Sequence, residues 1–200
     1  MCGRYHVDLE EENAQVRKIL MEINKRYFGT PEREQMKSGE IFPTNIVPVC
    51  SNNRKLHPGY FLMKWGFSAY EGTGVILNAR SESLLEKPMF RKAALERRCL
   101  VPAGHYFEWE RRGRERVKYA IRLPKEGLIY MAGVYRMEEG ERVPSFVIIT
   151  RPAAEEIAFI HDRMPLILAD GDRAAWLKPD ADVTGLFSRA QEQVRFEAVG

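Results

Sequence analysis

The sequence lacks the features that mark membrane-spanning, secreted or disordered proteins. No apolar run approaches the roughly 18 residues that a membrane span needs. No basic segment precedes a hydrophobic stretch at the start, so we expect no secretory signal peptide. Hydrophobic residues make up 44% and the formal net charge is +3, a combination that excludes an intrinsically disordered chain. We expect a globular cytoplasmic protein with no membrane partner, and the 200 residues fit one domain, 1–200.

Cysteine is also scarce. The three cysteines, Cys2, Cys50 and Cys99, are odd in number and far apart, and none belongs to a C-x-x-C pair. The sequence therefore predicts neither a disulfide framework nor a zinc site, which favours a reducing compartment. The four histidines include no pair with metal-ligand spacing, and we expect no metal and no other cofactor.

The middle of the chain is rich in β-branched and aromatic residues. We expect strands at 60–67, 75–80, 99–101, 106–110, 117–123, 128–135 and 146–150. Helical spacing from Val16 to Tyr27 predicts a helix, with a capping box at Asp8 and Glu11 and a stop at Gly29. Shorter helices are expected at 153–159 and 183–193, and irregular backbone with short extended pieces at 43–58. This pattern favours an α+β fold with a curved, barrel-like, mainly antiparallel β core and peripheral helices.

The first residues offer a reactive group that internal residues cannot. Because cysteine is small, we expect removal of the initiator Met1, which leaves Cys2 with a free α-amine beside its thiol. Such an aminothiol meets an aldehyde in two steps: the amine forms a Schiff base, and the thiol closes a five-membered thiazolidine. An α-amine with a pKa of about 7.7–8.0 is partly neutral near pH 7.5, whereas a lysine is roughly 0.1% neutral. The alternative is that Cys2 is a small buried residue at the start of a strand.

The segment 75–82 has one polar face. Strand alternation places Asn78, Arg80 and Glu82 on the side opposite Val75 and Leu77. An amide, a guanidinium and a carboxylate suit orienting a ligand and binding a phosphate. An edge ion pair between Arg80 and Glu82 is an equal alternative.

Two further segments hold acid–base candidates. Glu108 stands between Phe107 and Trp109, which share the other strand face and anchor a core. Partial burial would raise the pKa of Glu108 and allow it to hold and return a proton, but a half-exposed carboxylate paired with an arginine is the alternative. His161 ends a helical stripe that begins at Ala154, where a hydrogen-bonded core histidine is the common role.

Two sets of residues have more than one interpretation as nucleic-acid contacts. Trp65 suits either base stacking at the edge of a groove or a place in the core. The arginine cluster at 111–116 favours a solvated hairpin turn over a nucleic-acid contact.

Five motifs in one order carry more information than any of them alone. They are Met-Cys-Gly-Arg-Tyr at the start, Met63-Lys64-Trp65-Gly66, Asn78-Ala79-Arg80-Ser81-Glu82, Arg98-Cys99-Leu100-Val101-Pro102-Ala103 with Glu108-Trp109, and His161-Asp162-Arg163-Met164-Pro165. Together they closely resemble the SOS response-associated peptidase (SRAP) family, over nearly the whole chain.

The resemblance implies an activity in the DNA damage response. Family members capture the ring-opened aldehyde of an abasic site in single-stranded DNA and form a thiazolidine DNA–protein crosslink, with lyase and crosslink-reversal activities and autoproteolytic removal of Met1. The expected partner is therefore single-stranded DNA that contains abasic sites. We expect a monomeric, nucleoid-associated protein of the cytoplasm.

The resemblance also implies roles for individual residues. Cys2 matches the nucleophile, Asn78 the residue that positions it, Glu108 the proton shuttle, and His161 the histidine near the opened-sugar oxygen. The expected DNA contacts are Arg4, Trp65, Arg80, Arg91 and Arg163.

Two other functions remain open from the sequence. One is an N-terminal-nucleophile cysteine peptidase or amidohydrolase limited to its own processing, in which the α-amine of Cys2 acts as the base. The other is a module that binds single-stranded DNA without a covalent bond.

Overall fold

The computed structural model describes residues 2–10, 13–69, 74–124 and 127–199. Its strands are β1 (Arg4–Val7), β2 (Gly39–Ile41), β3 (Ile46–Asn52), β4 (Pro58–Trp65), β5 (Phe67–Ser68), β6 (Val75–Ile76), β7 (Asn78–Arg80), β8 (Arg98–Ala103), β9 (His105–Arg112), β10 (Glu115–Arg122), β11 (Ile129–Arg136), β12 (Ser145–Pro152), β13 (Arg163–Pro165) and β14 (Arg195–Ala198). Its helices are α1 (Ala14–Tyr27), α2 (Pro31–Gln35), α3 (Pro88–Glu96), α4 (Asp170–Leu177) and α5 (Val183–Ser188), with 3-10 turns η1 (Ser81–Ser83) and η2 (Glu155–Ile157).

Two large sheets form the core. One is antiparallel, with the strand order β14-β10-β9-β1-β2. The other runs β11-β8-β3-β4-β12-β13, and an additional pairing of β11 with β12 closes its first five strands into a ring. Parallel pairing occurs where β12 meets β4 and β7. The α+β fold with a curved, barrel-like, mainly antiparallel core is thus confirmed.

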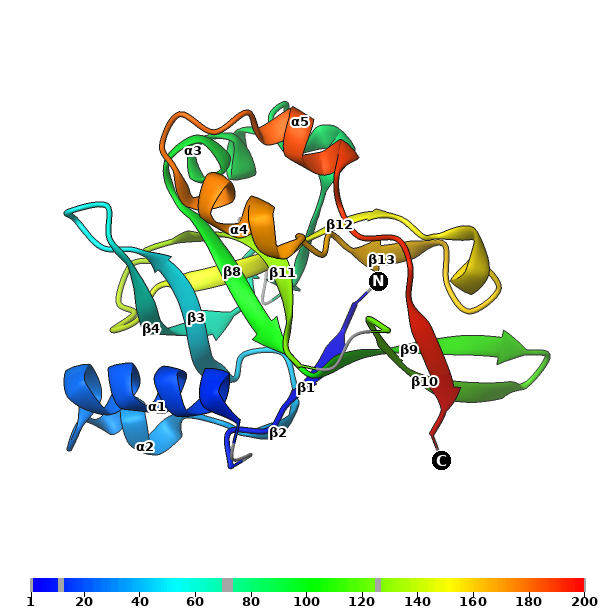
Figure 1. The fold of residues 1–200 in the computed structure, drawn as a ribbon, viewed down its shortest axis with the longest axis horizontal. Helices are drawn as coiled ribbons and strands as arrows, with labels where there is room; N and C mark the ends of the chain where they lie inside the picture. The colour runs from blue at the N-terminus through cyan, green and yellow to red at the C-terminus, as the bar shows by residue number, and fades with distance from the viewer. Residues whose placement is uncertain (1, 11–12, 70–73, 125–126, 200) are drawn as a thin grey trace.

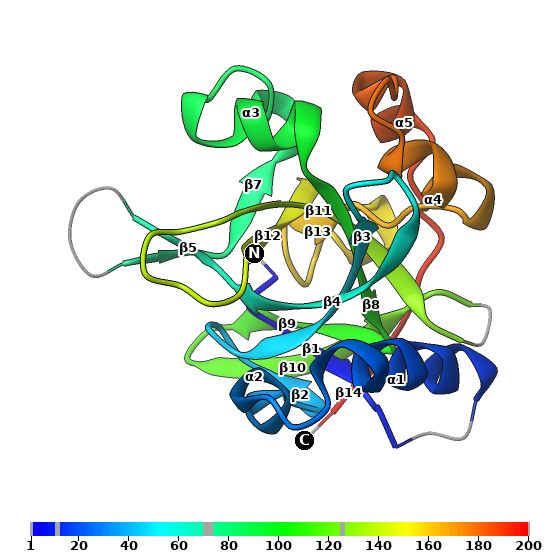
Figure 2. The same cartoon turned by 90° about the vertical axis from the view of Figure 1, so that its left-hand side faces the viewer.

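The helices lie outside the sheets. Figures 1 and 2 show α3, α4 and α5 gathered on one side and α1 with α2 on the opposite side. The first strand, β1, starts in the middle of the molecule near β13 in both views, and the β9–β10 hairpin extends away from the body. Within the described residues, no helix combines the length and apolar composition that a membrane span requires.

The first helix begins and ends for local reasons. Asn13 is the N-cap, and its side chain accepts a hydrogen bond from the Val16 backbone at 2.8 Å. The expected capping box is therefore corrected: Asp8 instead accepts from the Glu10 backbone at 2.8 Å, and Glu11 lies outside the described residues. Gly29 follows the helix with a φ of +71°, a left-handed conformation that favours glycine, as expected for the stop.

The stretch expected to be irregular with short extended pieces contains a full central strand. The stretch 43–58 contains β3, which lies between β8 and β4. Proline inside a strand argues against a central position because it donates no ladder hydrogen bond. Here the β3–β8 ladder covers only Cys50 and Ser51, so Pro48 lies beyond it and its missing N–H leaves no gap in that ladder.

Two expected helices are shorter than predicted. The segment 153–159 contains only the 3-10 turn η2, because β12 and β13 pair at Pro152 and Arg163 and confine the segment between them. The last helix, α5, ends at Ser188, and an unpredicted strand, β14, follows it.

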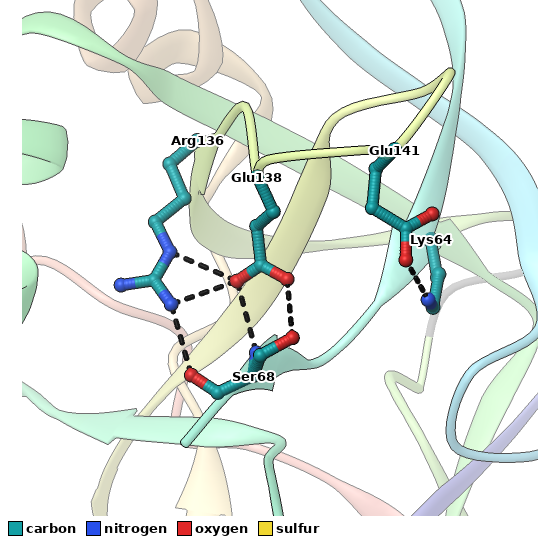
Figure 3. A network of polar contacts seen from close by, with 5 residues as sticks. All are labelled: Lys64, Ser68, Arg136, Glu138 and Glu141. Atoms are coloured by element: carbon teal, nitrogen blue, oxygen red, sulfur yellow. Dashed lines mark hydrogen bonds and ion pairs between the residues drawn. The ribbon is translucent and has the colours of Figure 1, made fainter. Parts of the chain in front are cut away.

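A polar network holds the loop between β11 and β12 against β5. The Glu138 carboxylate accepts hydrogen bonds from the Ser68 backbone at 2.9 Å, from the Ser68 hydroxyl at 2.6 Å and from Arg136 Nε at 3.0 Å (Figure 3). Arg136 Nη2 also donates to the Ser68 carbonyl at 3.0 Å, and Lys64 pairs with Glu141 farther along the loop. These contacts fix the end of β4 and the strand that follows it.

Candidate functional site

The site is built around Cys2, which lies two residues before the start of β1 and is fully buried. Asn78 Nδ2 donates a hydrogen bond to the Cys2 carbonyl oxygen at 2.9 Å. The Cys2 Sγ lies 3.8 Å from the carbonyl oxygen of Arg4, a weak contact at most. The backbone of Cys2 is therefore anchored by a side chain 76 residues away, while its thiol is only loosely engaged.

Asn78 is placed by the strand that carries it. β7 runs parallel to β12, with Asn78 opposite Ile148. The preceding residue, Leu77, accepts a hydrogen bond from the indole Nε1 of Trp65 at 3.2 Å. The Asn78 Oδ1 is buried and has no hydrogen-bond partner among the described residues. The site thus contains a buried acceptor oriented by a fixed amide, beside the backbone of Cys2.

Glu108 is the acidic group of the site. It lies on β9 and is only 3% exposed. Burial, with a smaller contribution from the Asp162 carboxylate, raises the pKa of Glu108 to about 7. Burial also raises the pKa of the Cys2 thiol, and the Glu108 carboxylate acts in the same direction. A carboxyl group that gains and loses its proton near neutral pH therefore acts electrostatically on a thiol that stays protonated.

Tyr106 is a site residue that the sequence interpretation missed. Its side chain is fully buried, and its hydroxyl has no hydrogen-bond partner within the described part of the chain. Burial raises the pKa of Tyr106, followed by the effects of Cys2 and Glu108. Strand alternation supplies the missed signal, because residues 106 and 108 share one face of β9.

His161 lies on the segment between η2 and β13, not at the end of an α-helix. Its Nδ1 is 3.0 Å from the Arg163 backbone nitrogen and 2.8 Å from Asp162 Oδ1. When the ring is neutral, Nδ1 accepts a hydrogen bond from the Arg163 backbone N–H; when the ring is protonated, Nδ1 donates one to the Asp162 carboxylate. Burial lowers the pKa of His161, so the neutral ring is favoured. The imidazole is held in place in either protonation state.

Arg163 differs from its expected role as a phosphate contact. Its guanidinium is buried and forms a two-point ion pair with Glu82, with 2.8 Å between Nη2 and Oε2. Nη2 also donates to the Thr150 carbonyl at 2.8 Å. This pair replaces the suggested Arg80–Glu82 pair and ties β13 to the turn that follows β7. Because Glu82 occupies the guanidinium, Arg163 serves to position the site in this structure.

Arg4 lies on the opposite face of the β1–β9 sheet. Its guanidinium is 4.4 Å from the Phe42 ring centroid and 5.4 Å from that of Trp109, and Nη1 is 3.1 Å from a Glu40 oxygen. Trp109 is only partly buried, which corrects its expected place as a core anchor, whereas Phe107 is buried. Arginine and aromatic faces are therefore available together at this surface.

A groove of about 750 Å³ adjoins Asn78. It is lined by Ile76, Asn78, Arg80, Lys87, Pro88, Met89 and Phe90. Arg80 is exposed, and Arg91 lies exposed on α3, one turn after Lys87. The sequence interpretation did not single out Lys87, although a lysine directly before the helix-starting Pro88 indicates a cation at a helix N-terminus. Two cations and that N-terminus make this groove favourable for an anion.

Trp65 is a core residue. Its side chain is fully buried and packs 5.2 Å from the Tyr5 ring and 6.4 Å from the Phe146 ring, centroid to centroid. No face of the indole is open to a base, which corrects the expected DNA contact. Trp65 instead supports β1 and the backbone that leads to Asn78.

The described residues therefore bring Cys2, Asn78 and Glu108 together, with Tyr106 added. The Asp162 carboxylate, next to His161 in the chain, acts electrostatically on Glu108. A cysteine near the start of the chain, beside a carboxyl group of near-neutral pKa, combines a nucleophile with a group suited to acid–base assistance.

The family model described as SOS response associated peptidase (SRAP) matches residues 1–200. The chain belongs to the SRAP family. The abasic site processing protein YoqW of Bacillus subtilis is 35% identical over 189 residues, covering 90% of this chain and 81% of YoqW. YedK of Escherichia coli, also named an abasic site processing protein, is 28% identical over 186 residues, with the same coverage of both chains.

The SRAP fold is also seen in solved structures. A crystal structure of a Bacteroides thetaiotaomicron protein superimposes with a TM-score of 0.77 at 21% identity, covering all of this chain and 92% of the other. At that identity, the likeness establishes the fold alone.

A vertebrate relative matches part of the chain. The abasic site processing protein HMCES of Gallus gallus is 34% identical over 125 residues, which cover 50% of this chain and 37% of HMCES.

Proposed function

We propose that this SRAP protein processes abasic sites in single-stranded DNA by a covalent thiazolidine crosslink through Cys2, after removal of Met1. Met1 itself lies outside the described residues. The names of YoqW, YedK and HMCES support the substrate class. The observation that carries the proposal is the hydrogen bond from Asn78 to the Cys2 carbonyl, which holds the second residue of the chain beside Glu108.

The reaction begins at nitrogen. The neutral α-amine of Cys2 adds to the aldehyde carbon of the ring-opened sugar, giving a carbinolamine. The hydroxyl group leaves as water after protonation, and loss of the N–H proton gives the imine. The Cys2 sulfur then bonds to the imine carbon while its proton passes to nitrogen, which closes the thiazolidine. The steps release one water and consume no cofactor.

Glu108 and His161 move the protons in this scheme. With a pKa of about 7, Glu108 is half protonated at neutral pH, so it donates to the departing hydroxyl and accepts a proton in return. His161, held in place in both protonation states, assists at the opened-sugar oxygen. The buried Asn78 Oδ1 accepts a hydrogen bond from a sugar hydroxyl or from the amine.

Phosphate binding falls to the exposed cations around the site. Arg80 and Lys87 line the groove beside Asn78, and Arg91 extends it along α3, whereas Arg4 pairs with Glu40 on the opposite sheet face. These cations contact the DNA phosphates and not the bases. DNA binding is therefore expected to weaken as the salt concentration rises and to depend little on the DNA sequence.

The decisive test uses a uracil-containing single-stranded oligonucleotide treated with uracil glycosylase. The mature protein should form an adduct that survives a denaturing gel, and peptide mass analysis should place it at Cys2. Cys2→Ala should form none. Cys50→Ala removes another buried thiol and should react like the wild type. The untreated oligonucleotide should give no adduct.

Hydrolysis by a nucleophilic Cys2 is the competing interpretation of this site. Hydrolysis by cysteine proceeds through the thiolate, and both burial and Glu108 raise the pKa of the Cys2 thiol. This favours the aldehyde reaction, in which the amine acts first. Turnover of a peptide substrate by mature protein that forms no adduct would establish the hydrolase instead.

A further inference from the structure

A second polar groove, of about 670 Å³, lies at the other end of β1 from Cys2. Among its lining residues are His6, His105, Arg122 and Arg195, which come from β1, β9, β10 and β14. The chemistry proposed at Cys2 uses none of them. The groove therefore needs its own explanation.

The two histidines form a stacked pair. His6 and His105 are directly opposite in the β1–β9 ladder, with ring centroids 4.8 Å apart and planes within 4° of parallel. Burial lowers the pKa of His105 to about 4, and His6, Arg122 and Lys118 act in the same direction against Glu197. Burial, aided by these cations, thus favours the neutral form of His105.

The two arginines are also direct partners. Arg122 and Arg195 face each other in the β10–β14 ladder, where like charges destabilise a sheet. A Glu197 carboxylate oxygen lies 3.3 Å from Arg122 Nη2 and offsets the charge of Arg122. Asp8, at the groove edge, accepts a hydrogen bond from the Glu10 backbone N–H at 2.8 Å. Arg195 forms no ion pair with another described residue. One guanidinium without an ion-pair partner among the described residues therefore lines the same groove as the imidazole pair.

We propose that this groove binds a phosphate group between the Arg122–Arg195 pair and the His6–His105 pair. A guanidinium offers phosphate two parallel N–H donors, and imidazole N–H groups donate from the adjacent wall. A bound anion relieves the repulsion between the two arginines. It also lowers the cost of protonating His105, and a protonated imidazole donates from both ring nitrogens.

The phosphate has two possible sources. One is a free phosphate compound such as inorganic phosphate or a nucleotide. The other is the backbone of a bound DNA strand, and this source rests on the proposed function. The sheet face opposite Glu108 leads from the groove toward Arg4: Lys118 Nζ is 3.8 Å from the Phe107 ring centroid, and Trp109, which lies beside Arg4, follows His105 by four residues on β9. At a strand rise of about 3.3 Å per residue, this path is about 13 Å long.

The first experiment follows the imidazole NMR signals of His6 and His105 during titration with inorganic phosphate. Both signals should shift, and the pKa of His105 should rise with phosphate bound. Arg195→Gln should weaken phosphate binding about tenfold, the effect of losing one charge-assisted hydrogen bond. Arg116→Gln removes an exposed arginine from β10 outside the groove and should leave binding unchanged.

The second experiment identifies the source with an intact oligothymidylate, so it needs no abasic site. If the backbone enters the groove, Arg195→Gln should lower the slope of log affinity against log salt by about 0.7, as expected for one lost phosphate contact on a single strand. An unchanged slope together with the inorganic phosphate response identifies a free phosphate compound as the ligand. The proposal is overturned if neither histidine responds to phosphate and the slope is unchanged, whatever the outcome at Cys2.

Discussion

Replacing Glu108 with glutamine should make the protein more stable at alkaline pH while it impairs the reaction. In the folded protein, burial raises the pKa of Glu108 from the ordinary 4.5 to about 7. At about 1.4 kcal/mol per pH unit, this difference corresponds to about 3 kcal/mol that the folded state loses when the carboxyl group ionises. Glutamine has nearly the same shape and carries no charge, so Glu108→Gln escapes that loss.

The direction of the pH dependence follows from linkage. Below pH 4.5 the carboxyl group is protonated in both folded and unfolded chains, so variant and wild type should differ little. Between pH 4.5 and 7 the wild type should lose stability relative to Glu108→Gln. Above pH 7 the advantage of the variant should reach its full value of about 3 kcal/mol. Urea unfolding at pH 4.5 and pH 8.5 measures both limits.

Glu110→Gln is the matched control on the same strand. Its carboxylate lies 2.9 Å from Arg112 Nε, and this hydrogen bond lowers the pKa of Glu110. Removing that charge should therefore destabilise the folded protein at high pH, the opposite sign. If Glu108→Gln changed the unfolding free energy equally at both pH values, the reasoning about its buried carboxyl group would be wrong. Adduct formation by Glu108→Gln should slow by about 10²-fold or more, because an amide neither gives up nor takes up a proton near neutral pH.

Three further changes test the remaining parts of the site. Asn78→Ala should slow single-turnover adduct formation by up to about tenfold, the value of one hydrogen bond. Trp65→Ala should lower the free energy of unfolding by about 3–5 kcal/mol in urea, whereas Trp65→Phe should keep most of the stability and normal adduct formation. A double-mutant cycle with Arg163→Gln and Glu82→Gln should give a coupling free energy of about 1 kcal/mol, and independent effects would contradict the ion pair.

Local patterns predicted the strands well because each signal lies within a few residues. Alternation along β9 indicated that Glu108 faces away from Phe107, and the structure buries it on the face of Tyr106. The arginine-rich turn near Gly113 joins β9 to β10 as expected, with a φ of +63° at the glycine. In both cases, the side-chain period and the turn chemistry determine the outcome.

The missed features depend on contacts between distant residues. Nothing near Arg163 indicates that its partner is Glu82, 81 residues earlier, because β12 brings β7 and β13 to its two sides only in the folded sheet. The burial of Trp65 likewise depends on the ring closed by β12. Local pattern alone cannot separate a buried aromatic from an exposed stacking platform.

The order of the proposed bond-forming steps follows from burial around Cys2. The surroundings that raise the pKa of Glu108 into the neutral range also keep the Cys2 thiol protonated, and an ionised Glu108 raises the pKa of that thiol further. A sulfur that attacked first as thiolate would need the opposite environment, with cations near the thiol. The α-amine needs no such help, since its ordinary pKa leaves it partly neutral near neutral pH. Nitrogen therefore adds first, and the sulfur follows once the imine carbon is electrophilic enough for a neutral thiol whose proton passes to nitrogen.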